Sequence, residues 1–290
     1  MPTLKEFNVK LTRLRSTRKL TKTMKLVSVN KLRRAQEAEK RVGLIASRLS
    51  NVLCHIGGTV AEGEHALVTP RKSIKTVMTL VITSDRGLCG GFNNNLIKAV
   101  AAWVRDQESN NRIVLLSCCG RRGFSFFKTR ATIDRHYEEV MGRPDFTHAH
   151  RIARGLQAAF TGGRVDEVYL AYNATQGTLS QKPLIERLVP MNTKELACQS
   201  PGKQSAGWLL EPSVEGLLNA LLPRIVSLKV YLALLNSSAG EHSARMKAME
   251  QASSNADTLI RQITLERNRA RQAQITTELT EIVAGAEALK

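Results

Sequence analysis

The feature that most constrains this chain is the length of two segments, one at each end, whose helical pattern is not interrupted. Between residues 4 and 53 there is no proline and a single glycine, Gly43. After residue 212 the pattern continues to about residue 289 and contains one proline, Pro223. At about 1.5 Å per residue, single helices of these lengths reach roughly 70 Å and roughly 110 Å. Both outrun a small domain between them, so we expect the two helices to pack on each other as an antiparallel coiled coil.

Apolar residues in both segments recur every three or four positions, which marks one face of a helix. The first helix begins such a face with Leu4, Phe7, Leu11 and Leu14, turns polar over residues 15–19, and resumes on a shifted face with Leu20, Met24 and Val27. The last helix carries two seams: Met249, Ala252, Ala256, Leu259 and Ile263, and then Ile275, Leu279, Ile282, Ala286 and Leu289. The second seam has heptad-like spacing. The polar stretch 266–274 separates the two seams, so we expect it to face something other than the first helix.

The middle of the chain alternates β-branched apolar runs with helical stretches. We expect strands at Thr76–Thr83, Ile113–Cys118, Thr132–Tyr137 and Glu167–Tyr172, and helices at about Asn93–Arg105, Gly120–Lys128 and His148–Phe160. Strands that alternate with helices indicate a small Rossmann-like α/β domain. The predicted fold class is therefore α/β with a long antiparallel coiled coil. Its expected parts are an N-terminal coiled-coil helix (1–56), a connection (57–73), the α/β domain (74–207) and a C-terminal coiled-coil helix (208–290).

The positive charge of the chain is concentrated at its N-terminal end. The formal net charge is +18, and residues 1–48 hold 14 Lys and Arg against 3 acidic residues, whereas residues 241–290 hold 7 of each. Such a basic stripe favours an acidic partner, which could be nucleic acid, a membrane surface or an acidic protein, although a solvated helix face has the same pattern. The first 35 residues also resemble an organellar transit peptide in composition. The helical pattern continues past Arg34, so we interpret the segment as mature protein. Because no run of 18 apolar residues occurs, no transmembrane helix is expected.

One glycine-containing turn is the main candidate for a chemical site. The expected strand at residue 76 is followed by Ser84–Gly91, which superficially resembles a phosphate-binding turn before a helix. Its glycines fit neither GxxxxGK[ST] nor GxGxxG, so we interpret it as a tight structural turn. Cys89 has no histidine near it in sequence, and the five cysteines show no metal-ligand spacing. Adjacent Cys118 and Cys119 would point to opposite faces of a strand, which disfavours a disulfide between them. The sequence predicts no catalytic residues, no cofactor and no metal.

Two polar clusters lie on the terminal helices. Residues 21–27 alternate cations with apolar side chains, but a nucleic-acid site would need interleaved aromatics or a helix-turn-helix companion, and neither is present. Arg269, Arg271, Gln272 and Glu278 form a second cluster, for which a solvated face is the alternative.

Four segments together resemble one family, the gamma subunit of F-type ATP synthases. They are residues 21–35, with TKTMKLV and KLRRA; residues 83–91, with TSDRGLCGG; residues 241–249, with EHSARM; and matching positions between Asn268 and Gly285. The resemblance covers the chain from end to end and keeps the family's order of motifs.

The resemblance implies a non-catalytic rotor. In this family the terminal helices form a coiled coil that enters the hexamer of alpha and beta subunits, and the α/β domain lies at the foot with the epsilon subunit and meets the membrane c-ring. Rotation driven by ion flow, usually of protons, changes the catalytic beta subunits in turn. The resemblance implies no nucleic-acid partner, membrane contact only through the c-ring, and a place at the cytoplasmic face of a bacterial inner membrane.

The resemblance also implies roles for individual residues. Arg271, Gln272, Thr276 and Glu278 match the family's contact with a catch loop of a beta subunit. Met24 and Lys25 match positions on the N-terminal helix opposite that cluster, where they would face the acidic lever of a beta subunit. A structural turn near the rim of the hexamer is implied for Ser84, Asp85, Arg86, Gly87, Gly90 and Gly91.

The sequence departs from the family's pattern in a few places. Thr23 stands where alanine is usual, and Gly240 stands where serine is usual. Since glycine inside a helix costs roughly 1 kcal/mol relative to alanine, Gly240 would mark a compliant point. The cysteine-containing insertion of the chloroplast forms is absent, which argues against thiol regulation and favours a bacterial enzyme.

Overall fold

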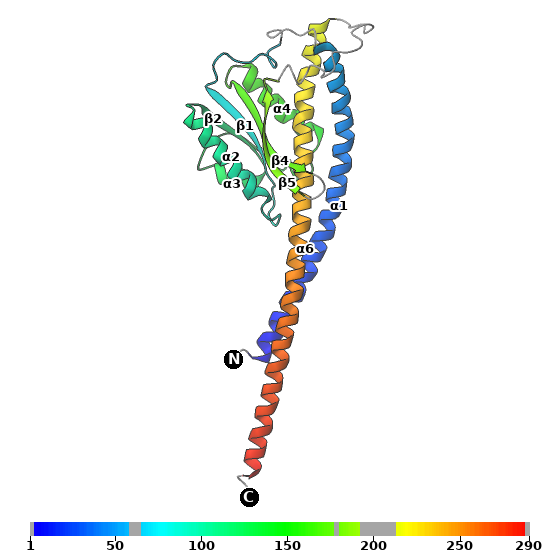
Figure 1. The fold of residues 1–290 in the computed structure, drawn as a ribbon, viewed down its shortest axis with the longest axis vertical. Helices are drawn as coiled ribbons and strands as arrows, with labels where there is room; N and C mark the ends of the chain where they lie inside the picture. Colours follow the sequence, from blue (N-terminus) through cyan, green and yellow to red (C-terminus); the bar gives the residue numbers. More distant parts are fainter. Residues whose placement is uncertain (1–2, 58–64, 177–179, 192–212, 288–290) are drawn as a thin grey trace. The chain divides into compact units, whose positions relative to one another are not determined.

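The computed structural model describes residues 3–57, 65–176, 180–191 and 213–287. The chain divides into two compact units: a coiled-coil unit, made of Met1–Val29 and Arg245–Lys290, and an α/β unit, made of Asn30–Ala244 (Figure 1). Helix α1 (Leu4–Gly57) and helix α6 (Val214–Glu287) each contribute one part to each unit. Their lengths of 54 and 74 residues confirm the prediction of two long terminal helices.

Side-chain caps mark the starts of both long helices. Before α1, the Thr3 hydroxyl accepts a hydrogen bond from the Glu6 N–H (3.4 Å) while the Glu6 carboxylate accepts one from the Thr3 N–H (3.1 Å). This reciprocal arrangement is a capping box, which satisfies two of the N–H groups that a helix start leaves unpaired. Before α6, the Ser213 hydroxyl accepts from the Gly216 N–H at 3.1 Å.

Helix α6 continues through Pro223, although a proline inside a helix removes one backbone hydrogen bond. The Pro223 carbonyl accepts hydrogen bonds from the Ser227 hydroxyl and from the Gln157 side chain, each at 2.9 Å. By length and composition, α6 also contains a stretch apolar enough to cross a membrane, and 39% of that stretch is buried inside the structure. A core helix passes the same test, so the stretch is weak evidence for a membrane span.

A five-stranded sheet forms the centre of the α/β unit, in the order β3-β2-β1-β4-β5. The strands are β1 (Thr76–Ile82), β2 (Ile113–Cys119), β3 (Thr132–Tyr137), β4 (Glu167–Gln176) and β5 (Ser180–Val189). The first four are parallel, and their connections contain α2 (Phe92–Ser109), α3 (Arg121–Phe127) and α4 (Phe146–Thr161). The four predicted strands and three predicted helices of this domain are therefore confirmed, with ends that differ by a few residues.

The fifth strand was not predicted from the sequence. Strand β5 pairs with β4 in antiparallel orientation, and this pairing extends β4 to Gln176, beyond the predicted end at Tyr172. Its sequence contains Pro183 and several polar residues, and exposed and partly buried positions alternate along most of it. Proline and charged side chains are tolerated on an edge strand, where they also discourage pairing with another chain. The polar composition of β5, which made it hard to predict from the sequence, is therefore explained by its edge position.

Apolar residues cover both faces of the sheet. On β1, Met78, Leu80 and Ile82 point to a cluster that includes α4, the N-terminal part of α6 and Leu53 of α1. Val77 and Val81 point to the opposite face, where α2 and α3 pack. Because side chains alternate along a strand, a strand buried on both faces reads as a continuous apolar run. This is the reason that β1 was recognisable from its sequence.

The connection between α1 and β1 joins this core in its second half. Leu67 and Val68 are buried, and the Leu67 carbonyl accepts a hydrogen bond from the Met191 N–H at 2.8 Å. Residues 58–64 and the predicted boundary at residues 207 and 208 lie outside the described residues. The predicted division into four parts therefore stays a prediction.

Candidate subunit-contact surfaces

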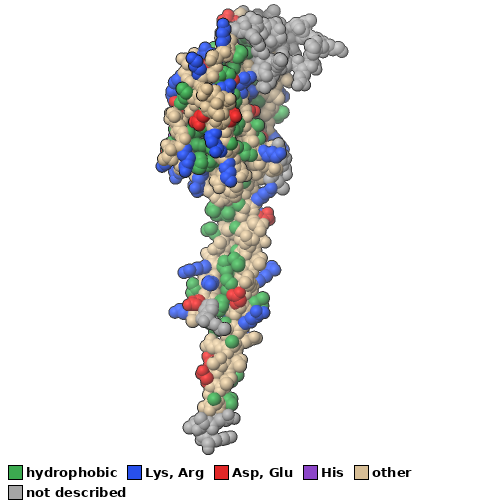
Figure 2. Space-filling view, turned by 60° about the vertical axis from the view of Figure 1, so that its left-hand side comes forward, with side chains coloured by type: hydrophobic (Ala, Val, Ile, Leu, Met, Phe, Trp, Pro, Cys, Tyr) green, Lys and Arg blue, Asp and Glu red, His purple; other side chains and the backbone are tan. Residues whose placement is uncertain are grey.

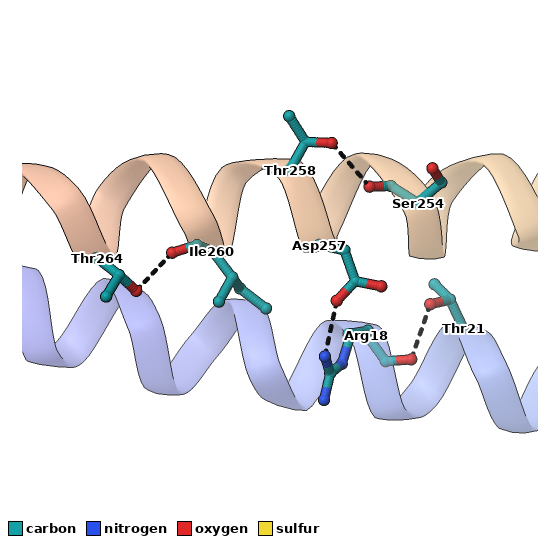
Figure 3. A network of polar contacts seen from close by, with 7 residues as sticks. All are labelled: Arg18, Thr21, Ser254, Asp257, Thr258, Ile260 and Thr264. Atoms are coloured by element: carbon teal, nitrogen blue, oxygen red, sulfur yellow. Dashed lines mark hydrogen bonds and ion pairs between the residues drawn. The ribbon is translucent and has the colours of Figure 1, made fainter.

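Two ion pairs show how α1 and α6 face each other in the coiled-coil unit. Arg18 donates to Asp257 at 2.7 Å (Figure 3), and Lys25 donates to Glu250. The partners are seven residues apart on both helices, and the numbers rise on α1 as they fall on α6. The pairing is therefore antiparallel, as predicted, and keeps one register over two turns. By this register, the first residue of α1, Leu4, lies at the level of Arg271.

The seam of α1 differs from the predicted one. Leu20 and Val27, which were expected to continue the seam on a shifted face, are 61% and 49% exposed. The positions that face α6 instead keep the heptad spacing that begins at Phe7 and Leu11. They continue through a polar series in which Thr21 and Ser28 are almost fully buried, Lys25 is partly buried and Arg18 is exposed. The interpretation of a shifted seam was therefore wrong. The same face of α1 continues toward α6, but its side chains change from apolar to polar.

The buried hydroxyls of this polar series are satisfied by their own helix. Thr21 donates to the Arg18 carbonyl at 3.0 Å (Figure 3), and Ser28 donates to the Met24 carbonyl at 2.8 Å. Such bonds let small polar residues occupy a helix interface without leaving a polar atom unpaired. The facing ion pairs are about half exposed, so each contributes only about 0.2–1 kcal/mol. The middle of the coiled coil is therefore specific in register but weakly stabilised.

The six residues that the family resemblance assigned to subunit contacts fall into two separate groups. Lys25 is paired with Glu250, and Met24 beside it is half-buried. Arg271, Gln272, Thr276 and Glu278 are all exposed on α6. By the register of the ion pairs, Lys25 lies 21 residues away from the level of Arg271, or roughly 30 Å along a helix. The structure does not place Met24 and Lys25 opposite the C-terminal cluster.

The exposed C-terminal cluster makes local contacts within its helix. Thr276 donates to the Gln272 carbonyl at 3.0 Å, and the Gln274 side chain donates to Glu278 at 2.8 Å. Each of these contacts joins residues four apart, one helical turn, so it is made within α6 itself. Because α1 begins at the level of Arg271, the part of α6 beyond that residue runs without α1 beside it.

An apolar stripe is exposed on the same part of α6. Ile275, Leu279, Ile282 and Val283 are 48–67% exposed. Three of them belong to the second predicted seam, so the expectation that this seam packs on α1 is wrong, while Leu289 lies outside the described residues. In the first seam Met249 and Ala256 are buried, but Leu259 is 45% exposed. Figure 2 shows apolar side chains at the surface of the coiled-coil unit. Large apolar side chains without a covering partner mark an interaction surface.

The turn at Ser84–Gly91 is held by its own hydrogen bonds. The Ser84 N–H donates to the Asn93 side chain at 2.9 Å, and the Ser84 hydroxyl donates to the Arg86 carbonyl at 2.6 Å. The Asp85 carboxylate accepts from the Arg121 N–H at 3.1 Å. The Ser84 N–H and hydroxyl are therefore already paired within the protein, and the Asp85 carboxylate would repel a phosphate, which supports the interpretation as a structural turn.

Backbone geometry explains two residues of that turn. Gly90 has a φ of +58°, a conformation in which L-residues are strained. Leu88 has a φ of +63° although it is not glycine, and its side chain is 61% exposed. Gly87 lies close to Arg122, since a Cβ there would meet the end of that side chain at 2.7 Å. The turn thus presents an exposed apolar side chain on a fixed backbone.

A nucleotide site is disfavoured by what fills the sheet's crevice. In open α/β sheets ligands bind outside the carboxyl ends of the strands, where the strand order reverses; here this place lies between β1 and β4. Helix α6 occupies it: Ser237 donates to the Ile82 carbonyl at 3.5 Å, and a Cβ on Gly240 would lie 3.2 Å from Phe92. Gly240 is therefore explained by close packing rather than by compliance.

Three of the cysteines are buried. Cys89, Cys118 and Cys119 are thiols in the interior of the α/β unit, and burial raises the pKa of Cys118 to about 12. A thiol with a raised pKa is a poor nucleophile, because the thiolate is the reactive form. Within residues 3–57, 65–176, 180–191 and 213–287, no cluster of three metal-ligating side chains was found. The one aromatic residue of α1, Phe7, is buried, so this helix offers no stacking platform for nucleic-acid bases.

Similarity to known proteins covers the whole chain. A family model described as ATP synthase matches residues 3–289. Proteins named ATP synthase gamma chain from Anaeromyxobacter dehalogenans (strain 2CP-C) and from Trichlorobacter lovleyi are 40% and 36% identical to it. In both cases the alignment covers all of this chain and all of the relative.

Solved structures share the fold. A chain of the Euglena gracilis mitochondrial ATP synthase aligns with a TM-score of 0.67 at 19% identity, covering 99% of this chain and 94% of that one. A chain from the central stalk and c-ring of the Tetrahymena thermophila mitochondrial ATP synthase aligns with a TM-score of 0.58 at 25% identity, covering 81% of this chain and 99% of that one.

Proposed function

The chain belongs to the ATP synthase gamma chain family, and on that premise we propose that it turns as the central rotor shaft of an F-type ATP synthase. In this role it couples transmembrane ion flow to ATP synthesis or hydrolysis at the beta subunits. The proposal rests on the whole-length match to the gamma chains. It gives the chain a mechanical task and no active site of its own.

One structural observation carries the proposal: α6 runs past the start of α1 and exposes an apolar stripe and a polar cluster side by side. Ile275, Leu279 and Ile282 are 48–67% exposed, although a long helix normally buries such a stripe. A sleeve formed by alpha and beta subunits would cover these side chains. A surface of this kind suits a shaft that must be held by its partners and still turn.

We propose that the two polar groups contact beta subunits at different heights. Arg271, Gln272, Thr276 and Glu278 are exposed and would meet a catch loop beyond the start of α1. Met24 and Lys25 would meet an acidic lever about 30 Å away along the helix pair. Because Lys25 is already paired with Glu250, such a lever would compete with an existing ion pair. Rim charges of this type mainly set association rate and orientation.

The remaining partners follow from the same proposal. The α/β unit would lie at the foot of the shaft with the epsilon subunit and meet the c-ring, and contact with the membrane would be through that ring alone. The structural turn at Ser84–Gly91, with exposed Leu88, would lie near the rim of the hexamer. The complex would lie at the cytoplasmic face of a bacterial inner membrane.

Co-expression with the alpha and beta subunits of the same organism tests the proposal. We expect a complex that contains one copy of this chain and three copies of each partner, as the family implies, and ATP hydrolysis that depends on all three. The chain alone should show no turnover. A chain that stays monomeric in the presence of both partners, or that shows its own activity, would contradict the proposal.

A further inference from the structure

One amide side chain in the α/β unit joins three elements of the fold. Asn236 of α6 accepts two hydrogen bonds at its Oδ1 from Thr175 of β4, one from the N–H at 2.8 Å and one from the hydroxyl at 2.9 Å. Its Nδ2 donates to the Glu39 carboxylate of α1 at 3.1 Å. Since a backbone N–H can only donate, the amide oxygen must face Thr175, and this fixes the orientation of the side chain.

The acceptor on α1, the Glu39 carboxylate, is partly buried, and burial disfavours its charged form. Glu39 lies seven residues after Leu32 and four after Ala35, on the inner side of α1, and burial raises its pKa. Tyr172 of β4 lies close enough to feel its charge: burial, the charge of Glu186 and the charge of Glu39 all raise the pKa of Tyr172. The Tyr172 hydroxyl itself donates to Glu186 of β5 at 3.0 Å. An apolar residue would suit this inner position better, so the carboxylate is explained by its bond to Asn236.

Close packing holds α6 in place one turn further along. Gly240 lies four residues after Asn236 and therefore on the same face of the helix. A Cβ there would lie 3.2 Å from both the Phe92 ring and the Gln181 side chain. The Phe92 carbonyl in turn accepts from the Asn173 side chain at 3.0 Å. The helix is thus pressed onto the carboxyl ends of β1 and β4, with Asn236 as its directional contact.

Hydrogen bonds resist rotation of a helix about its own axis more strongly than apolar packing does. Burial of aliphatic side chains is non-directional, so a helix can rotate slightly about its own axis at little cost. Hydrogen bonds weaken steeply when their angles change. Three bonds from one side chain to two neighbouring elements would therefore oppose rotation of α6 relative to both β4 and α1.

We propose that Asn236 is a positioning residue for torque: with Thr175 and Glu39 it locks both long helices to the sheet, so that rotation of the α/β unit is passed to the helices without slip. This inference rests on the proposed rotor function. It does not give Asn236 a part in ATP chemistry.

The test uses the assembled complex with its alpha and beta subunits. A probe is attached to an exposed position of the α/β unit, and the spread of its angle during a catalytic pause is measured on single molecules. We expect Asn236→Ala to widen the angular variance about twofold or more. Asn255→Ala, on the exposed face of the same helix in the coiled-coil unit, serves as the matched control and should leave the variance unchanged.

A pair of variants at Glu39 distinguishes an effect on the angular variance from an effect on the stability of the fold. Glu39→Gln keeps an oxygen acceptor for Asn236 and should keep the wild-type variance. Glu39→Leu removes the acceptor but suits the apolar seam, so it should widen the variance while the melting temperature of the chain stays the same or rises. A merely structural role would give the two variants the same variance.

The inference is overturned if Asn236→Ala and Glu39→Leu keep the wild-type variance, or if Asn255→Ala widens it equally. If Asn236→Ala does not assemble, the Glu39 pair decides by itself. A wild-type complex that does not rotate at all would instead contradict the proposed function, so the two failures are distinguishable.

Discussion

The α/β unit and the coiled-coil unit solve the problem of burial in opposite ways. In the α/β unit, apolar side chains are buried on both faces of the sheet, and polar side chains such as Asn236 have partners inside the unit. In the coiled-coil unit, polar residues occupy buried seam positions while Leu20, Leu265 and Ile282 are more than half exposed. The first unit is stabilised by its own core. The second unit leaves large apolar side chains exposed on its surface, where other subunits would cover them.

The largest effect should come from the core of the α/β unit. Phe160 is fully buried, and its replacement by alanine should cost about 3–5 kcal/mol of unfolding free energy through lost burial and a cavity. Leu265→Ala, at a 61% exposed position of the coiled-coil unit, should change it by less than about 0.5 kcal/mol. Urea unfolding of the isolated chain measures both. Similar costs at the two positions would remove the contrast between the units.

A backbone change should separate folding from assembly. Leu279→Pro breaks α6 where α1 does not accompany it, at a local cost of about 3 kcal/mol or more. We expect the melting temperature of the isolated chain to change little, because the α/β core is untouched. Assembly with the alpha and beta subunits, measured by size exclusion, should fail. Normal assembly would mean that the end of α6 is not needed for docking.

Removing one exposed charge should affect partners more than the fold. Arg271→Ala should weaken assembly or coupled turnover by about 1.5–3 kcal/mol if the guanidinium forms a charge-assisted hydrogen bond with a beta subunit. The unfolding free energy of the isolated chain should stay within about 0.5 kcal/mol. Titration of the complex and ATP hydrolysis rates report the first quantity. A complex of unchanged affinity and activity would show that the assigned catch contact is wrong.

Glu39 gives a pH-dependent difference within the α/β unit. Because burial raises its pKa above the usual value of 4.5, the folded chain binds this proton more tightly than the unfolded chain does. The stabilisation from that proton is complete below pH 4.5 and is lost as the pH rises through the folded-state pKa. Glu39→Gln should therefore raise the melting temperature at pH 7, and the gain should shrink toward pH 4. A gain that is the same at both pH values would argue against the buried carboxylate as its source.

The smallest effect is expected for the ion pairs of the coiled coil. Asp257→Ala and Lys25→Ala should each cost about 0.2–1 kcal/mol, and less in high salt, because both pairs are about half exposed. A double-mutant cycle of Arg18 with Asp257 measures the coupling directly. A coupling well above 1 kcal/mol would mean that the polar seam is more strongly stabilised than its exposure indicates.

The same contrast explains what could be predicted from the sequence. The strands and helices of the α/β unit were recognisable because β1 and β2 are apolar on both faces, and α1 and α6 because they lack helix-breaking residues. Strand β5 was missed because an edge strand tolerates Pro183 and polar side chains. The seam of α1 was wrongly assigned to Leu20 and Val27, because the spacing of apolar residues does not show which side of the helix another element covers. The unbroken heptad from Phe7 to Ser28 was the signal for the true seam.

The candidate site was harder to place than the fold. The assigned contact residues came from family motifs, and motif order does not show how far apart residues lie in space. The ion pair between Arg18 of α1 and Asp257 of α6 fixes the antiparallel register, and in this register Lys25 lies far from Arg271 along the helix pair. The family motifs alone do not contain this register. The lock at Asn236 joins residues from three distant parts of the chain, so no local pattern could indicate it.

Rotation of single complexes tests the central claim most directly. The alpha and beta subunits are fixed to a surface, a probe is attached to the α/β unit of this chain, and ATP is added. The proposed function predicts stepwise rotation of the probe in one direction, which stops when α6 is truncated before Arg271. A probe that stays still in a complex that hydrolyses ATP normally would contradict the account.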